Sequence, residues 1–170
     1  MDLRAEILKE HSRDQAMKIA NWIGANPNRF RQFMHLFLDD GYRVVQRAAW
    51  PLSLVAEKHP ELVIPYLPAI IKKMSEPGVH VAVKRNVVRI LQFIDIPEEL
   101  HGEVMNICFD LLGDQKETIA VRVFAMTVLA NLAKTYPDIK PELRTMIEDE
   151  LSHQPSAGFK ARAKKLIARI

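Results

Sequence analysis

The segment Val121-Arg122-Val123-Phe124-Ala125-Met126-Thr127-Val128-Leu129 is the clearest copy of a pattern that repeats along the chain and decides its fold. Basic or polar residues recur at intervals of 38 positions, at Gln46, Lys84, Arg122 and Lys160. At offsets of minus one, three, seven and ten from each of them the residues are apolar, except for Ser53. This spacing marks one face of an α-helix, so the pattern predicts a helix that occurs four times.

A second helix precedes each copy in the same register. Its apolar positions also lie 38 residues apart, at Phe33, Ile71, Phe109 and Ile147. Pro27, Pro65 and Pro141 share one phase of the repeat, and proline near a helix start gives up an amide that has no partner there. Each repeat is therefore predicted to contain a helix A, a short turn and a helix B.

Ten helices are expected in all. Their predicted bounds are 2–11 and 13–25, 29–39 and 43–58, 61–75 and 79–95, 98–113 and 118–135, and 140–152 and 157–169. They form one domain over residues 1–170, with repeats at about 2–25, 27–59, 61–95, 97–136 and 138–170. The first pair keeps the helix B spacing at an offset of 33, as irregular terminal repeats often do. Pro51 is expected to kink its helix near Trp50.

The segment 121–129 resembles the helix B signature of HEAT repeats, with Val-Arg, a small residue three positions on and Leu four beyond that. The stretch 141–162 is also similar to the end of short bacterial HEAT-like proteins. The resemblance implies an all-α, armadillo-like fold, a right-handed α-α superhelix of about ten antiparallel helices with helices B on its concave face. It also implies that Asp114 pairs with Arg122 in a ladder between repeats, and Glu76 with Lys84.

Composition indicates a protein of the cytoplasm. The start of the chain mixes both charges where a secretory signal would need an apolar run, and no apolar stretch reaches the roughly 20 residues of a membrane span. Cys108 is the single cysteine, and its apolar neighbours predict a buried thiol in a reducing compartment. We therefore expect no membrane partner.

Charge is divided unequally between the two kinds of predicted helix. Helices B carry 14 Lys and Arg against three Asp and Glu, whereas helices A and their edges carry eight against 17. A net charge of +3 thus conceals a polarised molecule. The split predicts a basic concave face, and the residues expected to bind a partner there are Arg43, Arg47, Trp50, Lys84, Arg85, Arg89, Arg122, Arg162 and Lys165.

Two functions fit such a face. The first is a noncatalytic scaffold that binds an acidic protein or peptide. The alternative is nucleic-acid binding, related to DNA alkylation repair, because glycosylases of that kind have HEAT-like arrays with a basic concave face. No motif aligns Trp22, Trp50 or Asp95 with the catalytic positions of those enzymes. A third interpretation is that the cations only link repeats and solvate the surface.

No chemistry-bearing motif supports an enzyme. The six histidines are scattered without ligand spacing, and there is no second cysteine, so no structural zinc is expected. Gly-rich phosphate loops, nucleophile elbows and His-Glu-x-x-His patterns do not occur. We therefore expect neither a cofactor nor a catalytic residue.

Overall fold

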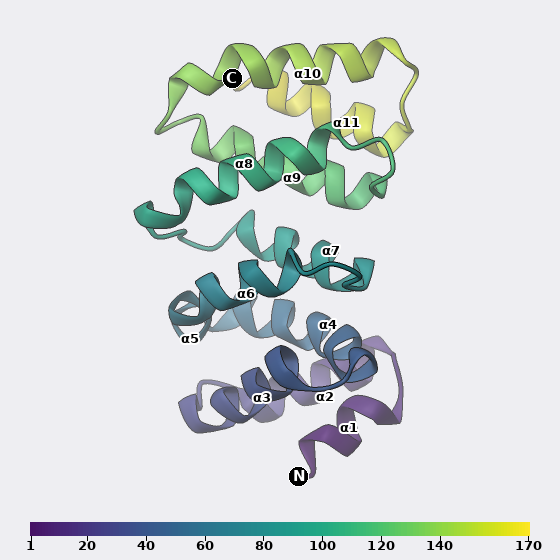
Figure 1. Ribbon diagram of the computed structural model, residues 1–170, viewed down its shortest axis with the longest axis vertical. Helices are drawn as coiled ribbons and strands as arrows, with labels where there is room; N and C mark the ends of the chain where they lie inside the picture. Colours follow the sequence, from purple (N-terminus) through teal and green to yellow (C-terminus); the bar gives the residue numbers. More distant parts are fainter. The chain divides into compact units, whose positions relative to one another are not determined.

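The computed structural model describes residues 1–170, and every regular element in it is a helix (Figure 1). The all-α prediction is thereby confirmed. The chain divides into two compact units, Met1–Ile96 and Pro97–Ile170, called here the N-terminal unit and the C-terminal unit.

The N-terminal unit consists of two layers of helices (Figure 1). One layer contains α1 (Leu3–Lys9), α3 (Pro27–Asp39), α5 (Pro60–Val63), the 3-10 helix η1 (Ile64–Tyr66) and α6 (Leu67–Met74). The other contains α2 (Arg13–Ile23), α4 (Tyr42–Lys58) and α7 (Val81–Leu91). The long helix α4 is central, since it packs against α1, α2, α3 and α7.

The C-terminal unit repeats this arrangement with fewer helices. Its first layer contains the 3-10 helix η2 (Glu98–Leu100), α8 (His101–Gly113), the 3-10 helix η3 (Pro137–Ile139) and α10 (Lys140–Ser152). Its second layer contains α9 (Ile119–Leu132) and α11 (Ala157–Ile167). Helix α9 packs against α8, α10 and α11, so it forms the middle of this unit.

Side-chain caps fix where several helices of the second layer begin. The hydroxyl oxygens of Ser12, Thr118 and Ser156 accept hydrogen bonds from backbone amides three residues later, at the starts of α2, α9 and α11. Each cap satisfies an amide that has no partner within its own helix, and is worth about 1 kcal/mol. Polar residues in the turns thereby set the register of the apolar faces that follow.

The repeated apolar positions form the core. Val83, Val121 and Phe159, one residue before each anchor of the repeat, are buried, and so are the residues three positions after the anchors. Ser53, the polar exception, is buried as well. Its hydroxyl donates to the carbonyl oxygen of Trp50 (2.9 Å) and accepts from Nη1 of Arg89 (3.0 Å), so its burial leaves no unmade hydrogen bond.

Several predicted helices differ in extent from those observed, and the one predicted at 98–113 begins as the 3-10 helix η2. Two others differ more. The helix predicted at 61–75 is divided into α5, η1 and α6, because Pro65 and Pro68 lack the amide hydrogens that a continuous helix needs. The helix predicted at 79–95 spans only Val81–Leu91 and ends in turns. Helix α4, by contrast, continues through Pro51. None of the helices combines the length and the apolar character that crossing a bilayer requires.

Candidate functional site

Two neighbouring helices of the N-terminal unit bring the predicted binding residues of that unit together. Arg43, Arg47 and Trp50 are spaced four and three residues apart on α4, which places them on one face of the helix. Arg85 lies on α7, which packs directly against α4. Arg43 and Arg85 are exposed, whereas Arg47 and Trp50 are half-buried.

The turn between α1 and α2 adds a residue that the repeat pattern did not indicate. The ring of His11 lies edge-on to that of Trp50, with 5.6 Å between the centroids. Nη1 of Arg47 donates a 2.6 Å hydrogen bond to the carbonyl oxygen of Leu8, which holds the guanidinium beside the same turn. We call the group Arg43, Arg47, Trp50, Arg85 and His11 the basic surface.

Cations from two helices act on the ring of His11. Partial burial, followed by the positive charges of Arg47, Arg85 and His80, holds the pKa of His11 below its ordinary value. The charges come from α4 and α7 and from the residue before α7, yet they act on one ring in the turn between α1 and α2. A negative charge placed beside this ring would therefore be attracted by these side chains.

The other two predicted cations of α7 are engaged differently. Arg89 donates to the hydroxyl of Ser53 and forms an ion pair with Glu57, both on α4. This pair joins α7 to α4 and neutralises much of the guanidinium charge. Lys84 is half-buried on the same helix.

Arg122 is a structural residue of the C-terminal unit. It is 6% exposed, and Nε donates a 3.0 Å hydrogen bond to the carbonyl oxygen of Leu112. Its two terminal nitrogens donate to the carboxylate of Glu150 on α10 at 2.9 and 2.8 Å, and the guanidinium lies 5.5 Å from the ring centre of Phe159. Little of its surface is left for a partner.

The predicted ion pair between Asp114 and Arg122 is wrong. Asp114 was expected to pair with Arg122, but an oxygen of Asp114 accepts the backbone amide of Lys116 at 2.8 Å. The capping geometry of this short turn uses the aspartate locally, and Glu150 supplies the carboxylate from the next helix instead.

Arg162 and Lys165 border a hollow between α9 and α11. It has a volume of about 580 Å³ and is lined by Ile119, Ala120, Val123, Gly158, Ala161, Arg162 and Lys165. Nη1 of Arg162 donates a 2.8 Å hydrogen bond to the hydroxyl of Thr127, so the side chain bridges the two helices. Lys165 is exposed.

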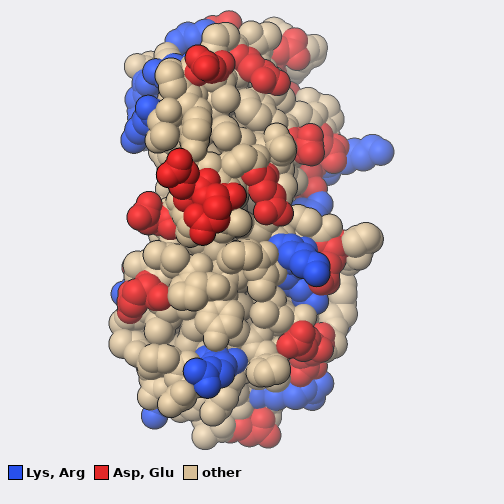
Figure 2. Space-filling model, turned by 60° about the vertical axis from the view of Figure 1, so that its left-hand side comes forward, with Lys and Arg blue, Asp and Glu red and all other residues tan.

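The predicted charge split is uneven between the units. In the C-terminal unit, α9 and α11 carry five Lys and Arg and no Asp or Glu, while the opposite layer carries two against nine. In the N-terminal unit, α2, α4 and α7 carry eight Lys and Arg against two Asp and Glu. The opposite layer of that unit also has a basic excess, with six Lys and Arg against three Asp and Glu. In Figure 2, acidic and basic side chains both occur on the face in view, each in several small groups.

No three His, Cys, Asp or Glu side chains are placed to hold a metal ion together. Cys108 is buried in α8, and this burial raises the pKa of its thiol to about 12, far from the reactive range.

Comparison with known proteins identifies one relationship. A family described as HEAT repeat domain matches residues 3–170, which is nearly the whole chain. No curated protein and no solved structure matches the sequence.

Proposed function

Because the chain belongs to the HEAT repeat domain family, whose repeats generally mediate protein interactions, we propose that it is a noncatalytic scaffold that binds an acidic segment of a partner protein on the basic surface of its N-terminal unit. The observation that carries the proposal is that Arg47 and Arg85, from two different helices, both act on His11, whose ring contacts that of Trp50. Like charges gathered from separate helices repel one another, so an anionic ligand relieves a cost that the free protein bears.

The residue types suit carboxylates. A guanidinium presents its N–H groups in a planar fork that matches the two oxygens of an Asp or Glu side chain. Arg43 and Arg85 are exposed and available for such contacts, and Arg47 is already held in place by Leu8. The half-buried indole of Trp50 offers an apolar plane beside them, and tryptophan and arginine are the side chains most often found at the energetic centres of interfaces.

A protein partner is favoured over nucleic acid by the number of cations. DNA-binding proteins typically neutralise about 6–10 phosphates. In the N-terminal unit Arg89 is paired with Glu57 and Lys18 with Glu6, so part of the apparent basic excess is already neutralised. The three arginines of the basic surface suit one or two carboxylates better than a long phosphate backbone.

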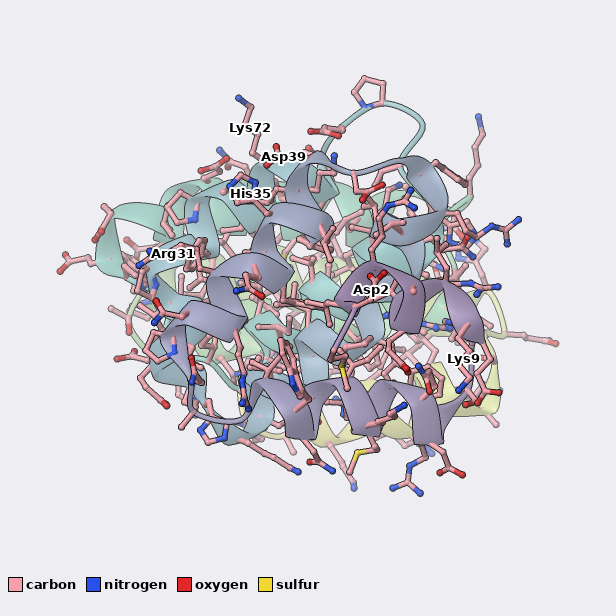
Figure 3. The ribbon with its side chains drawn as sticks, turned by 90° about the horizontal axis from the view of Figure 1, so that it is seen from below. Asp2, Lys9, Arg31, His35, Asp39 and Lys72 are labelled. Atoms are coloured by element: carbon pink, nitrogen blue, oxygen red, sulfur yellow. The ribbon has the colours of Figure 1, made fainter.

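The test is a binding titration with a fluorescein-labelled poly-glutamate peptide, followed by anisotropy. The double substitution Arg43→Glu and Arg85→Glu, which reverses two charges, is expected to weaken binding by about tenfold or more. The matched control carries Arg31→Glu and Lys72→Glu, which change the net charge by the same amount. These two residues are exposed on α3 and α6 of the opposite layer and point outward in Figure 3.

Two results would contradict the proposal. If the control pair weakens binding as much as the Arg43 and Arg85 pair, the peptide responds to net charge and not to a site. If duplex DNA binds with submicromolar affinity that falls steeply between about 50 and about 200 mM salt, while poly-glutamate does not bind, the partner is a nucleic acid.

A further inference from the structure

The hollow between α9 and α11 of the C-terminal unit differs chemically from the basic surface. We propose that it is a second binding site, which receives an acidic amphipathic peptide segment of a partner protein. An apolar side chain of the segment enters the hollow, and neighbouring carboxylates bind Arg162 and Lys165. The inference does not depend on the basic surface, because all the lining residues belong to α9 and α11.

The apolar part of the site is built from one large exposed side chain and several small ones. Ile119, the first residue of α9, is 51% exposed, which is unusual for an isoleucine in this chain. Ala120, Gly158 and Ala161 line the same hollow and leave space above the helix backbones. Covering this surface removes apolar area from water, which contributes about 25 cal/mol per Å². A volume of about 580 Å³ accommodates one or two large side chains.

The charged edge of the hollow determines the sign of the ligand. Arg162 is fixed across the groove by its hydrogen bond to the hydroxyl of Thr127, which in turn donates to the carbonyl oxygen of Val123 (3.0 Å). Lys165 lies one helical turn after Arg162. Since α9 and α11 carry no acidic residue, a carboxylate placed here meets no like charge from either helix.

The openness of the hollow favours a peptide over a free lipid. The groove faces solvent on one side, so a free acyl chain bound there would stay partly in contact with water. A side chain presented by a partner brings its own cover, because the partner's backbone and neighbouring residues exclude water from the open side. The groove therefore suits recognition of alternating apolar and acidic side chains.

Gly158 allows the site to be blocked without disturbing the fold. It is the second residue of α11, and a Cβ atom added there meets no atom within 4 Å. In Gly158→Leu the new side chain is expected to fill the hollow, while replacing glycine within a helix does not lower stability. Gly102→Leu is the matched control, because Gly102 is the second residue of α8 in the opposite layer and is equally unobstructed.

Binding is measured in the Arg43→Glu and Arg85→Glu background, so that the basic surface does not contribute. The probe is a labelled glutamate-rich peptide with two central leucines, compared with the same peptide carrying serines in their place. Gly158→Leu is expected to weaken binding of the leucine peptide by about tenfold or more with an unchanged Tm, and Gly102→Leu to have no effect. The serine peptide is expected to bind more weakly to the unblocked protein.

The inference is overturned if Gly158→Leu binds the leucine peptide as tightly as the Gly102→Leu control. Equal affinity for the leucine and serine peptides overturns it too, because the hollow would then contribute nothing. Displacement of the peptide by dodecanoate at equal concentration would reassign the groove to a free fatty acid. All of these outcomes are measured in the variant in which the basic surface is already disabled. They therefore test the hollow whether or not the basic surface binds poly-glutamate.

Discussion

Arg122 on α9 and Glu150 on α10 form a doubly hydrogen-bonded ion pair, with Nη1 to Oε1 at 2.9 Å and Nη2 to Oε2 at 2.8 Å. Their side chains are 8% and 13% exposed. Arg122 also donates to the carbonyl oxygen of Leu112 at the end of α8, and its guanidinium lies over the ring of Phe159 on α11. One side chain therefore contacts the other three α-helices of the C-terminal unit.

Glu150→Gln is expected to destabilise the protein by about 3 kcal/mol, because it leaves the buried charge of Arg122 without its counter-ion. Urea denaturation, followed by circular dichroism, measures this change. Glu148→Gln is the matched control on the same helix, since Glu148 forms an exposed pair with Arg144 at 3.6 Å and should cost less than about 1 kcal/mol. Equal effects of the two substitutions would show that the Arg122 pair has no special role.

The same pair makes the free energy of unfolding depend on pH in the acid range. Hydrogen bonds from Arg122 lower the pKa of Glu150 from the ordinary 4.5 to about 2 in the folded protein. A carboxyl whose pKa is lowered on folding stabilises the protein fully above its unfolded pKa, and this contribution is lost as the pH falls from about 4.5 to about 2. Stability measured by urea at a series of pH values should fall by about 2 kcal/mol more in the wild type than in Glu150→Gln. Parallel pH profiles would contradict the assignment.

Cys108 should be unreactive in the native protein. It is buried, and its burial raises the pKa of the thiol to about 12, so almost no thiolate is present at neutral pH. With Ellman's reagent we expect slow labelling whose rate follows global unfolding, and complete labelling in urea. Rapid labelling under native conditions would show that α8 opens on its own.

His11 reports on the charge of the basic surface. Partial burial and the nearby Arg47 and Arg85 lower its pKa, so its imidazole should titrate below the ordinary value of 6.5. Arg85→Gln removes one of the positive charges and should raise the pKa of His11. The ring proton shifts in an NMR titration measure both values. An unchanged pKa in the variant would mean that Arg85 does not act on this turn.

The helices were predictable because their signals are local. The 38-residue spacing located four of the five helices B, since each apolar face needs the same residues in the same register to pack on its neighbours. Helix α2 was located by the same internal spacing at an offset of 33. The division of the helix predicted at 61–75 was less accessible. Pro65 and Pro68 were visible as interruptions, but a 3-10 turn between two short helices depends on how the surrounding layer accommodates them. One continuous array over residues 1–170 stays a prediction.

The site was predicted only in part because charge counting does not distinguish a free cation from a paired one. Arg43, Arg85 and Lys165 are exposed as a binding surface requires, whereas Arg122 and Arg89 have the same sequence signature and form ion pairs. Glu150, the partner of Arg122, lies 28 residues away, at the repeat position that holds Leu36, Met74 and Leu112 in the earlier helices A. Asp114 accepts a backbone hydrogen bond within its own turn, so Arg122 pairs with Glu150 instead.

His11 and the hollow beside Ile119 were also missed. His11 belongs to the shortened first repeat, where the 38-residue register does not hold, so no offset connects it to Trp50. The hollow results from the small residues Gly158 and Ala161 on α11, opposite Ile119 on α9. A hollow formed between two helices depends on how they pack, so it could not be predicted from the sequence of either helix alone.

The central claim is that the N-terminal unit binds an acidic partner segment where Arg43, Arg47, Trp50, Arg85 and His11 meet. The most direct measurement is an NMR titration of isotope-labelled protein with the poly-glutamate peptide, following the arginine side chains and the indole N–H of Trp50. The account predicts that the resonances of Trp50, Arg47 and Arg85 shift together and saturate with one affinity. Shifts confined to α3 and α6, or none at saturating peptide, would contradict it.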